Sequence, residues 1–357
     1  MRLVNTTQVP ARLLVTRGAA ADERFGVLAA KATFTLEANP RLDVAGALPL
    51  FDADTPAADA ALGVLPADLR PRRRAYFEVM LLGRAHAGAQ PKAAVEVELG
   101  VGAQVRRMLA VGERRWRAGP GGAIAEAPTP FSSLPLAWSQ AFGGRARVHV
   151  DREAVIDVAD ADNPDGRGFD PLPQARALAE LLRAPPGFPI VEDAATLPGL
   201  LPPGVAPSQR SDRVPAICWA PVPSHAAIAR RAPSTAVHDT THDDPLHTAM
   251  DRAALRAHPD WILPLPAAPP RLRLRGTFAD GEARTWQLPA LRVSADGNVG
   301  GQRCALALRP ETLVLLPEQQ RFYLVYRACF RVDARHGASA ALRLRVDEGW
   351  SGATEAS

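Results

Sequence analysis

The sequence predicts a mainly β protein, with antiparallel, sandwich-like sheets built from its N- and C-terminal thirds. Between them we expect a Pro-rich irregular middle layer with one or two short helices. Two observations predict this: alternating segments at hairpin spacing near both ends, and prolines every few residues from Pro171 to Pro270. With 357 residues, 47% of them hydrophobic, the chain is long enough to bury a sizeable core.

Several segments of the N-terminal third have the composition of strands. Residues 93–99 (AAVEVEL) alternate apolar and acidic side chains with period two, as expected for a strand with one solvent-facing side. β-branched and aromatic residues between turn formers mark the others, at 11–16, 25–36, 76–85 and 105–111. We interpret the basic run at 70–74 (RPRRR) as a solvated approach to a strand rather than as a nucleic-acid patch.

The middle of the chain is expected to be irregular. Proline lacks the N–H that a central strand donates, and it biases the preceding residue toward extended geometry. The exceptions are 174–183 (QARALAELLR) and 247–257, which have helical spacing and good helix formers. Four apolar residues favour a layer pinned onto the sheets over a disordered linker: Phe188, Ile190, Trp219 and Trp261.

The C-terminal third returns to strands. Residues 271–278 (RLRLRGTF) alternate strictly, and further candidate strands follow at 283–288, 304–308, 312–316 and 321–330. Asp280-Gly281 and Asp296-Gly297 are dipeptides typical of hairpin turns. We therefore expect a single domain over 1–357, with a β part at 1–160, an irregular part at 161–270, a second β part at 271–347 and a flexible tail at 348–357.

Composition argues against several classes of protein. The net charge of +4 is small for this length and does not indicate nucleic-acid binding. Only Lys31 and Lys92 are lysines, a bias toward arginine that we attribute to codon usage. The first residues lack the apolar core of a signal peptide, and no apolar run approaches the roughly 18 residues of a membrane span. We expect a soluble cytoplasmic protein whose reduced cysteines, at 218, 304 and 329, are buried.

The strongest catalytic candidate is the segment 238–247 (HDTTHDDPLH). His238, His242 and Asp243 could ligate a divalent metal if the segment were helical, as in a metal-dependent hydrolase. Its threonines and Pro245 disfavour a helix, and it lacks the glutamate of a zinc-protease helix, so a polar His-rich loop is the simpler interpretation. Acidic pairs elsewhere neither support nor exclude a glycosidase. No cofactor is predicted.

Two loops are dense in residues with special backbone or surface properties, 127–144 (APTPFSSLPLAWSQAFGG) and 162–170 (DNPDGRGFD). Their glycines permit positive φ, and asparagine before proline starts a turn whose amides can form an anion nest. Aromatic and arginine side chains, which these loops carry, are enriched in protein–protein hot spots. Alternatively, the rings pin the loops to the core. Composition alone leaves both interpretations open.

The order of short signatures along nearly the whole chain resembles a bacterial family catalogued as domain of unknown function 2169. The matching residues are VNTT-x-x-PA at 4–11, AKATF at 30–34, LLGRAHA at 81–87, GERRW at 112–116, PF-x-x-LPL-x-W-x-x-AFGG at 130–144, NPDGRGF at 163–169, PIVED at 189–193 and LVYRACF at 324–330. The AFGG and NP-x-G-x-G pair is the most specific. The chain resembles a divergent member, because Asp162 and Val191 replace a basic residue and an asparagine of the family pattern, and its aromatic-Asn-Ala-Pro stretch is missing.

The resemblance implies a function without chemistry, since the family commonly accompanies the VgrG spike and effector genes of type VI secretion. It implies an adaptor or chaperone that binds a cognate effector and assists its loading onto VgrG. From charge and hydropathy we expect neither nucleic-acid binding nor membrane insertion. We expect the partner-binding residues to be Phe131, Trp138, Phe142, Arg145, Asn163, Arg167, Phe169 and Glu192. The alternatives are the metal-dependent hydrolase and a carbohydrate-binding β module.

Overall fold

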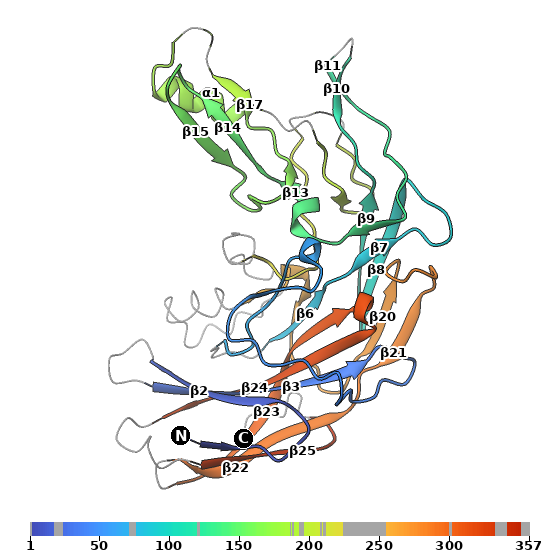
Figure 1. Cartoon of the computed structure of the whole chain (residues 1–357), viewed down its shortest axis with the longest axis vertical. Helices are drawn as coiled ribbons and strands as arrows, with labels where there is room; N and C mark the ends of the chain where they lie inside the picture. Colours follow the sequence, from blue (N-terminus) through green and yellow to red (C-terminus); the bar gives the residue numbers. More distant parts are fainter. Residues whose placement is uncertain are drawn as a thin grey trace.

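The computed structural model of the chain describes residues 2–17, 24–70, 76–119, 122–185, 187, 189–192, 196–207, 209, 212–223, 255–299, 302–332 and 341–350. The molecule is elongated, with a large sheet at one end, a second sheet in the middle and a small lobe at the other end (Figure 1). Strands dominate the described part, and α1 (Leu172–Leu181) is its one α-helix, so the predicted mainly β fold is confirmed.

The large sheet has nine strands: β1 (Arg2–Val4), β2 (Ala11–Arg17), β3 (Arg24–Thr35), β6 (Phe77–Leu81), β19 (Ile262–Leu263), β22 (Leu291–Val299), β23 (Gln302–Leu316), β24 (Arg321–Arg331) and β25 (Ala341–Glu348). It joins the two ends of the chain, because β24 pairs with β3 along its whole length and β1 lies parallel to β25. The N- and C-terminal β parts therefore form one structure.

Strand β23 changes partners half-way along. Its first half pairs with β22, and its second half pairs with β24 and, in parallel, with β6. The register shifts between Pro310 and Thr312, which marks a β-bulge. A bulge bends the strand and increases its twist, and proline is tolerated there because no ladder bond is lost. One bent strand thus replaces the two strands predicted at 304–308 and 312–316.

The second sheet has five strands: β18 (Leu200–Leu201), β9 (Gln104–Val111), β8 (Ala94–Val101), β20 (Arg271–Arg275) and β21 (Arg284–Gln287). Its inner face contributes Val97, Leu99, Leu272 and Leu274 to the main core. On its outer face the Glu98 carboxylate lies 2.8 Å from the guanidinium of Arg107 and 2.9 Å from that of Arg273. These two side chains bury Glu98, although the alternating pattern predicted that it faces solvent.

The remaining elements are small. The small lobe consists of α1 and a three-stranded sheet of β15 (Val155–Ala159), β14 (Arg145–His149) and β17 (Ile190–Glu192). Two-stranded pairs are β10 (Trp116–Gly119) with β11 (Gly122–Ala125), β12 (Ser133–Pro135) with β7 (Arg84–His86), β13 (Phe142–Gly143) with β16 (Arg167–Gly168), and β4 (Thr55–Pro56) with β5 (Val64–Leu65). Short 3₁₀ helices are η1 (Ala60–Leu62), η2 (Trp138–Gln140), η5 (Pro259–Trp261) and η6 (Pro317–Gln319). No helix among the described residues has the length and apolar character that crossing a bilayer requires.

Several local predictions are confirmed and others are wrong. The helix predicted at 174–183 is α1, and Asp280-Gly281 lies between β20 and β21 as a hairpin turn should. Asp296-Gly297, in contrast, lies inside β22. A Cβ on Gly297 would stand 2.0 Å from the carbonyl oxygen of Ala341 in the neighbouring strand, so this glycine permits close strand approach instead of a turn.

The irregular middle is pinned to the sheets, as predicted, but not by all the expected residues. Trp219 and Trp261 are fully buried and meet edge to face, with ring centroids 5.9 Å apart. Ile190 is exposed. Phe188 and residues 247–254 of the second predicted helix lie outside the described residues, and 255–257 are not helical. The tail is anchored at least to Trp350, whose Nε1 donates to the carbonyl of Pro266 at 2.9 Å.

A buried ion pair attaches residues 43–70, which we call the strap, to the large sheet. The Lys31 ammonium on β3 lies 2.5 Å from the Asp68 carboxylate and donates to the carbonyl of Pro49 at 2.8 Å. It also lies 3.9 Å and 4.5 Å from the ring centroids of Phe51 and Tyr323. Burial lowers the pKa of Lys31 to about 8, although Asp68 acts in the opposite direction.

Further buried charges surround this pair. Arg327 on β24 donates to the backbone carbonyl of Asp68 at 2.5 Å and to the Thr312 hydroxyl at 2.8 Å. It thereby joins the strap to two strands of the large sheet. Because charged groups are costly to bury without partners, each of these contacts fixes the path of the strap as well as stabilising it.

Glu78 on β6 likewise holds two other segments in place, residues 256–257 and the end of the strap at Arg70. Its carboxylate accepts hydrogen bonds from the backbone N–H groups of Arg256 and Ala257, at 2.5 and 2.9 Å, and lies 3.3 Å from the Arg70 guanidinium. Arg70 is buried, so the expectation that the basic run at 70–74 is solvated is wrong at its first residue. Residues 71–74 lie outside the described part of the chain.

Replacing Lys31 by Met is expected to lower the free energy of unfolding by about 3–5 kcal/mol, because Asp68 is left as an uncompensated buried charge. The double variant Lys31→Met/Asp68→Asn should lose clearly less than the sum of the two single variants. Urea unfolding followed by tryptophan fluorescence measures all three. Arg12→Met, which breaks the exposed pair with Asp52, is the control and should change stability by less than about 1 kcal/mol. Additive losses would contradict a coupled pair.

The lowered pKa of Lys31 also predicts a pH dependence with a definite sign. In the unfolded chain the lysine pKa is about 10.4, so between about pH 8 and 10.4 the unfolded state holds more protons than the folded state. Raising the pH through this window therefore stabilises the folded state. The stability of the wild type relative to Lys31→Met should increase by roughly 3 kcal/mol. Urea titrations at several pH values check this, and a constant difference would refute it.

Candidate functional site

The two glycine-rich loops identified in the sequence meet and bind each other. Strands β13 and β16 pair in parallel, which places Phe142 opposite Arg167 and Gly143 opposite Gly168. The N–H of Phe169 donates to the carbonyl of Gly143 at 3.0 Å. We call this joint, residues 138–144 with 163–169, the loop knot. It lies where the small lobe meets the rest of the molecule (Figure 1).

Asn163 is the centre of the loop knot. Its side chain is fully buried, and Nδ2 donates to the backbone carbonyls of Trp138 and Phe142 at 2.9 and 3.0 Å. Its own backbone carbonyl accepts from the N–H groups of Gly144 and Gly166 at 2.8 and 3.2 Å. Asn163 thus supplies hydrogen-bond partners to backbone groups of both loops, which are too irregular to form the hydrogen bonds of a helix or a long strand pair. Its role here is structural.

Glycine is required at two points of the loop knot. Gly143 has a φ of +141°, and a Cβ there would lie 2.0 Å from the carbonyl oxygen of Asn163. Gly168 has a φ of +92°, and a Cβ there would lie 2.6 Å from the Pro198 ring. A larger residue at Gly143 would force the two loops apart, and one at Gly168 would collide with Pro198. The glycines of these signatures therefore serve close backbone approach.

The rings of Trp138 and Phe142 lie in the interior. Trp138 donates from Nε1 to the carbonyl of Ala220 at 3.0 Å, and its ring stacks on His258 with centroids 6.2 Å apart. Phe142 belongs to a small apolar cluster that includes Val111. The expectation that these two rings and Asn163 face a partner on the surface does not agree with their burial. Sequence composition could not separate hot-spot aromatics from core aromatics.

The other two aromatic residues of the predicted set are half-buried. Phe131 packs against the main core, and its backbone exchanges hydrogen bonds with Lys92. Phe169 packs against the small cluster beneath α1. Each ring therefore contributes to packing and retains part of its surface for contact with solvent or a partner.

The predicted polar residues differ in exposure. Arg145 is exposed, donates to the carbonyl of Pro164 at 3.2 Å and pairs with Asp165 at 2.8 Å. Arg167 donates to the carbonyl of Ser139 at 2.9 Å, and burial lowers the pKa of its guanidinium. Both arginines thus also reinforce the loop knot. Glu192 lies in β17, further out in the small lobe. Partner binding by this set stays a prediction.

The outer part of the small lobe exposes four large aliphatic side chains that the sequence analysis missed. They are Leu181 (78% exposed), Leu182 (50%), Ile190 (54%) and Val155 (48%). The strand register places Val155 and Ile190 on either side of His149, at the end of β14 farthest from the loop knot, on the sheet face opposite the residues that pack with α1. Helical spacing from Leu178 would assign both leucines to the core, but α1 ends at Leu181. We call these four residues the lobe tip.

A shallow pocket of about 240 Å³ lies between the loop knot and α1. Its lining includes the rings of Phe142 and Phe169 and the charged side chains of Asp160 and Arg213. The Arg213 guanidinium is 2.9 Å from the Asp162 carboxylate and 3.4 Å from that of Asp160. Aromatic walls with already paired charges are typical of a docking contact rather than of acid–base chemistry.

His238, His242 and Asp243 lie outside the described residues. Within the described ranges, no group of three or more His, Cys, Asp or Glu side chains could hold a metal ion. Cys218 is buried, and desolvation raises the pKa of its thiol to about 12, so the thiol is protonated at neutral pH. Cys329 is exposed and Cys304 partly so, contrary to the prediction of three buried thiols.

Comparison with known proteins gives one match. A family model described as "Uncharacterized protein conserved in bacteria (DUF2169)" matches residues 21–327. No curated protein and no solved structure matches the chain. The match spans both glycine-rich loops and most of the large sheet.

Replacing Asn163 by Ala is expected to lower the free energy of unfolding by about 2–4 kcal/mol, because the backbone carbonyls of Trp138 and Phe142 lose their buried donor. Arg145→Ala, in the same joint but exposed, should cost less than about 1 kcal/mol. Denaturant titration of both variants measures the difference. Equal, small losses would show that the loop knot does not depend on Asn163.

Proposed function

The chain belongs to the DUF2169 family, and on this premise we propose that it is a cytoplasmic adaptor or chaperone for a type VI secretion effector. It would hold its cognate effector and assist loading onto the VgrG spike. The ordered signatures that the chain shares with this family support the proposal, as does the architecture around the two most specific of them.

The observation that carries the proposal is the exposed apolar lobe tip. Leu181 alone exposes 78% of its surface, and three more large aliphatic side chains accompany it. Several large exposed apolar side chains on one small lobe are candidates for an interaction site. A protein client would remove this surface from water, with a gain of roughly 25 cal/mol for each Å² buried.

The loop knot supports the same function by fixing the lobe. Gly143, Gly168 and Asn163 leave the two loops little freedom, so the lobe is held in one orientation before a client arrives. A preorganised surface loses less conformational entropy on association, which favours binding. An interface of moderate size would still release the client when it passes to the spike.

Co-expression of the chain with the effector encoded beside its gene tests the proposal. We expect the two to co-purify, and the double variant Leu181→Asp/Ile190→Asp to weaken the complex at least tenfold in a binding titration, as hot-spot changes do. Leu14→Asp, which alters an exposed leucine on β2 of the large sheet, is the matched control and should bind normally.

Two outcomes would count against the proposal at different levels. If the effector does not co-purify and is delivered normally after deletion of this gene, the adaptor function is refuted. Circular dichroism should show that the Leu181→Asp/Ile190→Asp variant is folded. If the effector co-purifies equally with this variant, the client binds another surface.

A further inference from the structure

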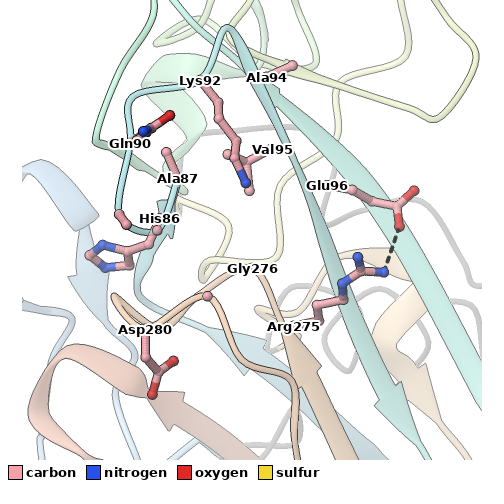
Figure 2. Close-up of a pocket in the computed structure, with 13 residues that line it drawn as sticks. His86, Ala87, Gln90, Lys92, Ala94, Val95, Glu96, Arg275, Gly276 and Asp280 are labelled. Atoms are coloured by element: carbon pink, nitrogen blue, oxygen red, sulfur yellow. Dashed lines mark ion pairs between the residues drawn. The ribbon is translucent and has the colours of Figure 1, made fainter.

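A second pocket, of about 510 Å³, opens between the loop that follows β7 and the hairpin of β20 and β21 (Figure 2). Its lining includes His86, Lys92, Glu96, Arg275 and Asp280. Figure 2 shows the Lys92 side chain pointing down into the pocket, with Arg275 and Glu96 at one side. The pocket is broad and open, which suits an extended chain better than an enclosed small molecule.

The charges of the lining are balanced, with Lys92 and Arg275 against Glu96 and Asp280, but both carboxylates also pair with arginines outside the lining. Asp280 lies 2.6 Å from the Arg284 guanidinium, and Glu96 lies 3.8 Å from those of both Arg275 and Arg107. Each carboxylate of the lining is therefore matched by at least one arginine. Lys92 forms no ion pair with any residue that the structure describes. Its ammonium is the uncompensated charge of the pocket.

Basic side chains outnumber acidic ones on the outer face of the five-stranded sheet, which adjoins the pocket. The strand register places four arginines there, Arg107, Arg271, Arg273 and Arg275, against Glu96 and Glu98. Glu98 is already covered by two of these arginines. The pocket and this face thus form one continuous basic surface, which attracts negatively charged partners.

We propose that this pocket and the adjoining sheet face bind an acidic peptide segment, with one carboxylate seated between Lys92 and Arg275. The lining carboxylates, Glu96 and Asp280, would repel a continuous polyanion such as nucleic acid. An extended peptide presents its same-side carboxylates about 7 Å apart, so it can place them beside the basic groups and away from Glu96. The site goes beyond the adaptor function and lies in a different part of the fold from the lobe tip.

The scarcity of lysine allows a direct test on the full chain. Lys31 is buried, so reductive ¹³C-methylation in the folded state should label Lys92 and the N-terminal amine, and it preserves the charge. Lys92→Arg identifies the resonance by its loss. We expect an acetylated hexaglutamate peptide to shift the dimethyl-Lys92 resonance and a hexaglutamine peptide to leave it unchanged. A resonance that responds to neither peptide overturns the proposal.

Three variants sharpen the test, with affinity for dye-labelled hexaglutamate measured by fluorescence anisotropy. Arg275→Gln should weaken binding at least fivefold, and Glu96→Gln should strengthen it at least twofold, because it removes the opposing carboxylate. Arg345→Gln is the matched control: Arg345 has a similar side-chain exposure to Arg275 (59% against 53%) and is likewise paired with an acid, Asp296, but it lies on the large sheet.

The remaining outcomes decide between ligand sources. Equal weakening by Arg345→Gln would mean that net charge alone attracts the peptide, which refutes a defined site. If acetate or inorganic phosphate shifts the Lys92 resonance at the same concentration as the peptide, the pocket is a small-anion site and the peptide assignment is wrong. Neither result depends on a client effector, so the adaptor function is tested separately.

Discussion

The buried ion pair of Lys31 and Asp68 is the contact on which the covering of the large sheet depends. The strap has little regular structure, so periodic backbone hydrogen bonds cannot specify its path. A buried ammonium, in contrast, is stable only beside a carboxylate, because an unpaired charge in the interior costs several kcal/mol. Arg327 extends this constraint to the strap backbone and Glu78 to Arg70. The charges thus select one arrangement where apolar contacts alone would allow several.

The loop knot also fixes irregular segments, but with neutral hydrogen-bonding groups instead of charges. One asparagine amide and closely approaching glycines join two loops that are more than 20 residues apart in the sequence. Since the lobe continues directly from this joint, its orientation is set by the two glycine-rich loops. The residues that looked suited to client contact thus support the lobe, and the residues exposed at its tip, Leu181 among them, have no distinctive motif.

Much of the fold could be predicted because period-two alternation is visible in a single strand. The errors share a cause: they concern properties that arise only when distant segments meet. Arg70 is buried because Glu78 lies beside it, and Gly297 serves strand approach because the strand of Ala341 passes so close. Composition alone could not decide whether Trp138 and Phe142 are buried or exposed, because aromatic residues are common in both places. The basic pocket was missed because Lys92 and Arg275, which form it, are far apart in the sequence.

The pairing of β3 with β24 has a consequence for synthesis. Strand β3 leaves the ribosome early, yet its partner is translated only after most of the chain. Until then the edge of β3 opposite β2 has no native neighbour, and such edges recruit other chains. A nascent chain of this topology, rich in non-local contacts, should mature slowly and mainly after its last strands emerge. Its yield in cells would then depend on general chaperones that shield the early strands during translation.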